Sequence, residues 1–225
     1  MHHEVSLLTH YLNSWFGLHL PDHAVMSTLV FIISVMVFVV LSGKPQLIPS
    51  PVQAFYEGII RSVGGVLIDS MGRKGLRFLP FISSLAIFIF LSNLIGLIPG
   101  FTSPTGNLNT TVGCALAVFL YYNYHGFREH GWRYIQHFTG PVWWLAWLLF
   151  PIEIISHLAR PFSLSVRLFA NMFADHMVLA VFFGLVKWLI PVPLLAIGLF
   201  VCFIQTLIFV VLSSIYLAGS VEHAH

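Results

Sequence analysis

The sequence has very few charged side chains. Only 8% of its 225 residues are Asp, Glu, Lys or Arg, against about 25% in an ordinary soluble domain. In contrast, 58% are hydrophobic, and the mean hydropathy is +0.89. So few charges cannot cover a surface that faces water, so we expect an integral membrane protein. The net charge of +2, without a run of basic residues, argues against a nucleic-acid partner.

Cysteines and catalytic motifs are also scarce. Cys114 and Cys202 both lie in apolar stretches, which suggests neither a disulfide framework nor a metal cluster. The sequence contains no GxSxG, P-loop, HExxH or CxxC motif. These absences predict a non-catalytic protein without a cofactor or a bound metal.

Apolar runs divide the chain into membrane-embedded segments of a single membrane domain, residues 1–225. The predicted fold class is an all-α integral membrane protein with about five membrane-embedded helices and one interfacial amphipathic segment. The expected segments are a non-cytoplasmic N-terminus at 1–23, a first span at 24–41, the interfacial segment at 51–77, spans at 76–98 and 110–124, and a helical hairpin at 141–220. The tyrosines that end the third span are expected in an interfacial aromatic belt; they are Tyr121, Tyr122 and Tyr124.

The segment at residues 141–190 is too long for an upright span. As one helix, its roughly 50 residues would extend about 75 Å, more than twice the hydrocarbon thickness of about 30 Å. Either it is two spans broken near Pro161, or it is one long, steeply tilted helix. A turn at residues 191–193 is then expected to lead into the final helix.

Basic side chains indicate the orientation in the membrane. They lie between the first two spans and after the third, whereas the loops at residues 1–23 and 99–110 carry none. The positive-inside rule therefore places the N-terminus outside the cytoplasm, and a hairpin returns the C-terminus to the inside.

Residues 151–176 carry a stripe of polar side chains. At about 100° per residue, one helix face collects Glu153, His157, Arg160, Ser163, Arg167, Asn171 and Asp175. The opposite face is apolar and suited to lipid or apolar neighbours; it consists of Ile152, Ile155, Leu158, Phe162, Val166, Phe169 and Phe173.

A guanidinium within the membrane needs a partner or a role, because inserting it costs about 2.5–3.5 kcal/mol. Arg167 could form a structural ion pair, for example with Asp175, or it could be a fixed charge on an ion path, since arginine keeps its proton. A path of titratable groups is available in Glu153, His157, Asp175 and His176. Gln205 adds a buried amide, which alone would more often join helices.

Three segments resemble subunit a of the bacterial F-type ATP synthase. They are SLSVRLFANMFADH (163–176), FLSNLIGLIPG (90–100) with NLNTT (107–111), and IQTLIFVVLSSIYL (204–217), in that order and spacing. The resemblance covers most of the chain from about residue 24. It implies a stator subunit in the bacterial inner membrane, with a periplasmic N-terminus and a cytoplasmic C-terminus. It also implies two proton half-channels against a rotating ring of c subunits, and a peripheral stalk of b subunits.

The resemblance also implies roles for individual residues. Arg167 matches the essential arginine that faces the ring. Asn171 and Gln205 match positions that line the aqueous paths, Glu153 and Ser163 match positions on the cytoplasmic side of the arginine, and Tyr216 matches a polar position late in the final helix.

The chain departs from the family pattern at three positions. It has Asp175-His176 where many relatives have Gly-Glu or Gly-His, Gly198 where some have His, and Asn107 where many have an acidic residue. Asp175 could face position 198 across the hairpin, and either Asp175 or His176 could relay the proton.

Two other functions fit the residues less well. An ion-coupled secondary transporter would need its own substrate site at broken helices and would work without partners. A structural subunit of another membrane complex would use Arg167 only for packing. The sequence leaves proton and sodium open, because the ion-binding carboxylate would belong to another chain.

Overall fold

Every regular element of the computed structural model is helical. The structure describes residues 21–41, 51–98, 101–131, 146–185 and 191–222. In chain order the elements are α2 (Asp22–Leu41), α3 (Pro51–Met71), the 3-10 segment η1 (Gly72–Phe78), α4 (Leu79–Gly96), the 3-10 turn η2 (Pro104–Gly106), α5 (Leu108–His130), α7 (Ala146–Leu185) and α8 (Pro191–Glu222). No strand occurs in these ranges, so the predicted all-α class is confirmed.

Within the described residues, three helical stretches are long and apolar enough to cross a membrane. They are residues 57–96, 150–182 and 193–221, while the apolar part of α2, residues 22–37, is shorter. The chain is therefore a multi-pass membrane protein.

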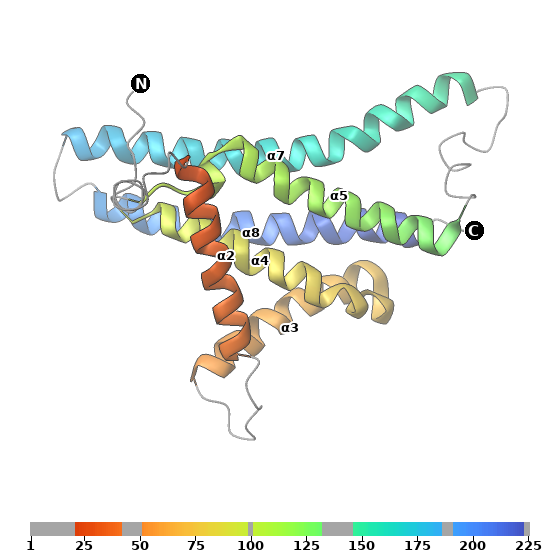
Figure 1. Cartoon of the computed structure of the whole chain (residues 1–225), viewed down its shortest axis with the longest axis horizontal. Coiled ribbons are helices and arrows are strands. Elements are labelled where there is room, and N and C mark those ends of the chain that lie inside the picture. The colour runs from red at the N-terminus through yellow and green to blue at the C-terminus, as the bar shows by residue number, and fades with distance from the viewer. Residues whose placement is uncertain (1–20, 42–50, 99–100, 132–145, 186–190, 223–225) are drawn as a thin grey trace.

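The long segment before the hairpin turn is one helix. α7 runs for 40 residues, about 60 Å, with Pro151 and Pro161 inside it. The alternative in which this segment breaks into two spans near Pro161 is therefore wrong. Proline removes one backbone hydrogen bond and crowds the preceding turn, and Figure 1 shows α7 bent near its middle and not interrupted. A helix of this length must lie tilted within a bilayer.

Several predicted boundaries are corrected by the structure. α5 covers 108–130, not 110–124, because the Asn107 side chain caps its first turn by accepting from the Asn109 N–H at 3.0 Å. It ends at Gly131, whose φ of +53° suits glycine. The second span begins at Leu79, after η1. α8 begins at Pro191, where a missing N–H costs a helix nothing. The predictions for residues 1–20 and 132–145 lie outside the described residues.

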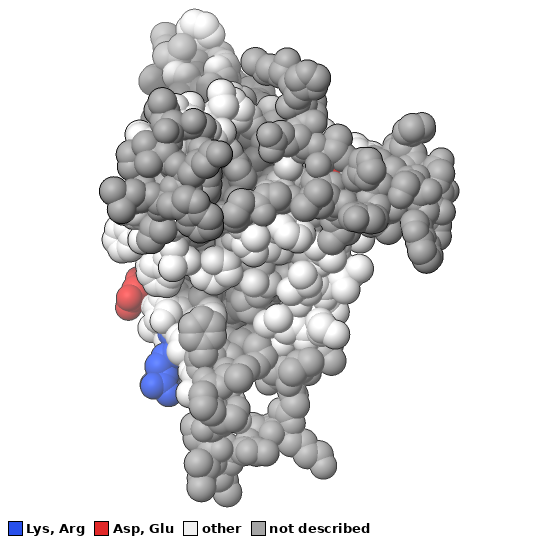
Figure 2. Space-filling view, turned by 90° about the vertical axis from the view of Figure 1, so that its left-hand side faces the viewer, with Lys and Arg blue, Asp and Glu red and all other residues white. Residues whose placement is uncertain are grey.

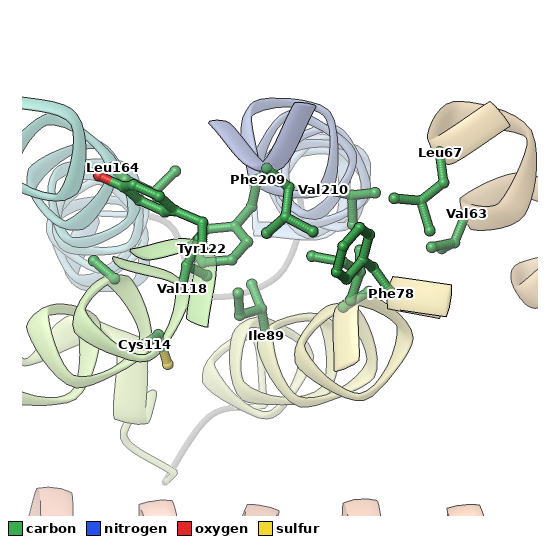
Figure 3. Packing of buried hydrophobic residues seen from close by; sticks show 14 of the residues in the cluster. Val63, Leu67, Phe78, Ile89, Cys114, Val118, Tyr122, Leu164, Phe209 and Val210 are labelled. Carbon is green, nitrogen blue, oxygen red and sulfur yellow. The ribbon is translucent and has the colours of Figure 1, made fainter. Parts of the chain in front are cut away.

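Helix α8 lies at the centre of the packing, in contact with α3, α4, α5 and α7. Figure 1 shows the axes of α4, α5, α7 and α8 lying roughly along one line, with neighbouring helices running either way, while α2 crosses them steeply. Side chains from these helices meet in one apolar cluster that includes Phe78, Ile89, Tyr122, Leu164 and Phe209 (Figure 3). The hairpin that carries the polar stripe is thus supported along one face by the rest of the chain.

The tyrosines of α5 do not form the predicted aromatic belt. Tyr122 is only 1% exposed and belongs to the core. Tyr121 stacks on Phe81 with ring centroids 3.8 Å apart. Of the three, Tyr124 alone is exposed.

The predicted apolar face of α7 is largely open. Ile155 and Phe162, for example, are 67% and 70% exposed. On the face of the molecule shown in Figure 2, most of the visible charged atoms of described residues lie near one edge, and most other described atoms are uncharged. Such a surface suits contact with lipid or with apolar protein.

Candidate ion path

Arg167 lies at the boundary between the packed and the open faces of α7. Leu164 and Leu168 on one side of it are buried, whereas Val166 and Ala170 on the other side are exposed. The one ion pair among the described residues joins Arg77 and Glu129. Arg167 therefore has no acidic partner in this part of the chain, and the alternative of a structural ion pair with Asp175 is not formed. Its partly exposed guanidinium can meet a carboxylate of another molecule.

An amide pair joins the two arms of the hairpin one turn beyond Arg167. Asn171 Nδ2 donates to Gln205 Oε1 at 2.6 Å, and Gln205 is 2% exposed. On the other side of Arg167, the Arg160 guanidinium lies over the ring of Tyr216, 5.7 Å from its centroid. Both contacts fit one antiparallel register, in which each step forward on α7 is a step back on α8.

Asp175 and His176 face different neighbours. A Cβ atom on Gly96 would lie 2.9 Å from His176 Nε2, and one on Gly106 would lie 3.7 Å from His176 Cδ2. The imidazole therefore occupies a slot between the end of α4 and η2. Asp175 lies one turn beyond Asn171 on α7 and therefore faces the part of α8 just before Gln205, which includes Cys202.

The register set by the two contacts between the arms places Gly198 about one turn away from the α8 residues opposite Asp175. A Cβ atom on Gly198 would lie 2.7 Å from Leu97 Cδ2, so α4 covers this glycine. The same register brings Cys202, one turn farther on in α8, close to the level of Asp175.

A buried group of polar side chains lies next to His176, where η2 packs against α4. Ser103 Oγ donates to the Ser92 carbonyl oxygen at 2.9 Å and lies 2.7 Å from Thr105 Oγ1. Thr105 Oγ1 donates to Asn93 Oδ1 at 2.6 Å. Sequence reasoning assigned none of these residues a role, although a polar pair inside the apolar α4 and an uncharged loop of hydroxyls were visible signals.

On the other side of Arg167, His157 is tied to α5. Its Nε2 lies 3.0 Å from Asn123 Oδ1 and 3.3 Å from Tyr122 Oη. Asn123 Nδ2 donates to the Phe119 carbonyl oxygen. This bond orients the Asn123 side chain so that its Oδ1 faces the imidazole. Because that oxygen can only accept, Nε2 carries a hydrogen in this contact.

The polar stripe therefore divides across the faces of α7. His157 and Asn171 turn toward α5 and α8, whereas Ser163 is exposed on the open side. Glu153 is partly exposed. Buried polar groups thus lie on both sides of an arginine that has no partner within the described chain.

These features define a class of protein, namely a multi-pass helical membrane protein in which an arginine, without an acidic partner among the described residues, separates two groups of intramembrane polar side chains. Comparison with known proteins is more specific. The family model described as ATP synthase A chain matches residues 24–218, and the chain belongs to this family.

Bacterial relatives agree with the family match. The chain is 48% identical over 204 residues to ATP synthase subunit a 2 of Syntrophotalea carbinolica, covering 91% of this chain and 87% of the relative. It is 46% identical to ATP synthase subunit a of Geobacter sulfurreducens, covering 90% and 89%. It is 43% identical to ATP synthase subunit a of Sulfurihydrogenibium sp., covering 91% and 99%. The resemblance drawn from the sequence is confirmed.

Proposed function

We propose that this chain is the stator subunit of the ATP synthase membrane sector. It forms two proton half-channels against a rotating ring of c subunits and couples proton flow to rotation and ATP synthesis. The observation that carries the proposal is Arg167, which is partly exposed, has no acidic partner among the described residues, and lies between two polar groups. The subunit itself is non-catalytic and needs no cofactor.

Protons enter through an inlet and leave through an outlet that do not meet within this chain. The inlet is lined by Asn171, Asp175, His176 and Gln205, and it delivers protons to a carboxylate on the ring. After nearly a full turn of the ring, protons leave through the outlet, lined by Glu153, His157, Ser163 and Tyr216. Arg167 separates the two and favours the deprotonated carboxylate opposite it.

The magnitudes allow this cycle. An arginine and a carboxylate about 4 Å apart attract by about 4 kcal/mol at an effective dielectric constant near 20. One charge that crosses the membrane gains about 2.3 kcal/mol per 100 mV. The attraction is therefore strong enough to hold the carboxylate ionised and weak enough to be broken at each step.

The proposal also specifies partners and location. The ring contacts the Arg167 face, and the peripheral stalk of b subunits holds the chain in place. The complex lies in the bacterial inner membrane, with the N-terminus periplasmic and the C-terminus cytoplasmic. A secondary transporter finds no support among the relatives, and purification tests it directly, because a transporter would not copurify with a ring of small two-helix subunits.

Thiol accessibility tests the two water paths. In a background with Cys114→Ala and Cys202→Ala, single cysteines at 171 and 205 are expected to react with silver ions and to block proton transport. Cysteines at 155 and 162, on the exposed apolar face of α7, serve as controls. These should react slowly, because lipid excludes the ion. Equal reaction at all four positions would contradict a path confined to the polar side.

Replacing Gln205 by leucine should slow proton uptake about three- to tenfold. The change removes the acceptor of the Asn171 amide at a buried site, where an unpaired polar group is costly. The measurement is the rate of proton-driven ATP synthesis in proteoliposomes. Leu207→Ala, an exposed position on the same helix, is the control, and an unchanged rate in Gln205→Leu would remove this residue from the inlet.

A further inference from the structure

Two polar atoms near the inlet are buried without a hydrogen-bond partner among the described residues. Asn93 in α4 is 0% exposed, and its Oδ1 accepts from Thr105, so its amino group points away from that bond. Asp175 Oδ2 on α7 is likewise buried and unpartnered. The first atom is a donor, and the second is an acceptor when the carboxyl group is ionised. Both need a partner, since an unpaired buried polar group costs folding free energy.

The packing of α4 on α8 brings these two side chains to the same place. Leu97 of α4 contacts Gly198 of α8, and the two helices run in opposite directions (Figure 1). One turn back from Leu97 on the same face is Asn93, and one turn forward from Gly198 is Cys202. The Asn171–Gln205 hydrogen bond supplies the second link, because Asp175 lies one turn beyond Asn171 on α7 and Cys202 lies one turn before Gln205 on α8. Asn93 and Asp175 therefore both lie beside Cys202, at the junction of α4, α7 and α8.

We propose that the Asn93 amino group donates a hydrogen bond to the ionised Asp175 carboxylate through one water molecule, and that Asn93 is thereby a positioning residue for proton uptake. The inference rests on the proposed function. A proton from the outer aqueous phase adds to the Asp175 carboxylate and then leaves it toward the ring carboxylate, while Asn93 gains and loses none. The N–H group stabilises the charged form of Asp175, which allows the proton to be released in each cycle.

The hydroxyls of η2 hold the amide in this orientation. Thr105 donates to Asn93 Oδ1, and Ser103 links Thr105 to the backbone of α4 at Ser92. With the carbonyl oxygen occupied on this side, the amino group stays directed away from η2. The titratable groups that the structure places beside Asp175 are His176 on α7 and Cys202 on α8, and the described residues of α4 and η2 there contribute only amide, hydroxyl and backbone groups.

The test uses complete ATP synthase in proteoliposomes, with the rate of ATP synthesis measured against the pH of the inlet compartment at a fixed membrane potential. Asn93→Leu keeps the side-chain volume and removes the donor, so Asp175 should hold its proton more tightly. We expect the pH midpoint of synthesis to rise by about one unit, equivalent to a tenfold change in proton affinity, and the maximal rate to fall severalfold. Thr105→Val should shift the midpoint in the same direction by less. Ser83→Ala, at a buried hydroxyl near the opposite end of α4, should leave the profile unchanged.

Asp175→Asn separates this inference from the proposed function. If that variant synthesises ATP at the wild-type rate, Asp175 is not on the path and the proposed inlet is wrong. If it is slow while Asn93→Leu leaves the midpoint unchanged, only the inference fails. In the Asp175→Asn background, Asn93→Leu should add no further shift, and an equal shift in both backgrounds would show that Asn93 acts on another group. Thr105→Val decides the matter if the Asn93→Leu complex does not assemble.

Discussion

Replacing Arg167 by alanine is expected to abolish proton-driven ATP synthesis while the complex still assembles. Arg167 contacts no acidic residue in the described part of the chain, so its loss should not break the hairpin. What is lost is the fixed positive charge that holds the ring carboxylate ionised and separates inlet from outlet. The measurements are ATP synthesis in proteoliposomes and recovery of the ring with the purified variant.

Two further variants make this result specific. Arg167→Lys keeps a positive charge, but lysine can lose its proton and lacks the planar guanidinium that binds a carboxylate through two hydrogen bonds. This variant should therefore also fail or leak protons. Arg128→Ala, at an exposed position of α5, is the matched control and should synthesise at close to the wild-type rate. Coupled synthesis in Arg167→Ala at the wild-type rate would refute the role, and loss of assembly would show instead that the arginine serves packing.

Replacing Gly96 by alanine should reduce proton-driven synthesis at least tenfold. The added Cβ atom would lie 2.5 Å from Ser103 Cβ and 2.9 Å from His176 Nε2, closer than real Cβ contacts allow. Either η2 or the imidazole must move. Adding a methyl group to a well-packed interior typically lowers stability by about 1–3 kcal/mol. Both belong to the inlet side, so the synthesis rate and its dependence on inlet pH should change together.

Gly113→Ala is the matched control for this substitution. Gly113 is also helical, and nothing lies within 4 Å of the Cβ atom it would gain. Alanine favours a helix over glycine by up to about 1 kcal/mol, so this variant should be neutral or slightly more stable. Equal loss of synthesis in the two variants would attribute the effect to glycine itself and not to the slot around His176.

The helical class and the polar stripe could be predicted because they depend on local periodicity. Spacing along α7 placed Arg167 and Asn171 near one face, and length alone required a tilted or broken segment. The effect of Pro161 could not be predicted, because helices tolerate an internal proline where tertiary contacts support them. Packing against α5 and α8 decided that outcome.

The neighbours of the site residues could not be predicted from the sequence either, because they also depend on packing between helices. Within the sequence of its own helix, Tyr122 looks like an interfacial tyrosine. In the structure it is buried, and its hydroxyl lies against His157 of α7. The level of Asp175 relative to Cys202 depends on the register of the two arms, and Leu97 of α4 packs against Gly198. Asn93 gains a role only when η2 folds back against α4. Each of these contacts joins elements that are far apart in the chain.

The two contacts between the arms of the hairpin constrain how this region can evolve. Arg160 and Asn171 are eleven residues apart on α7, and their partners Tyr216 and Gln205 are eleven apart on α8. Eleven residues make about three helical turns, so both contacts recur on one side of each helix. Inserting or deleting one residue between them in either arm would rotate one contact by about 100° away from its partner. Lineages should therefore vary this stretch by substitution and keep its length.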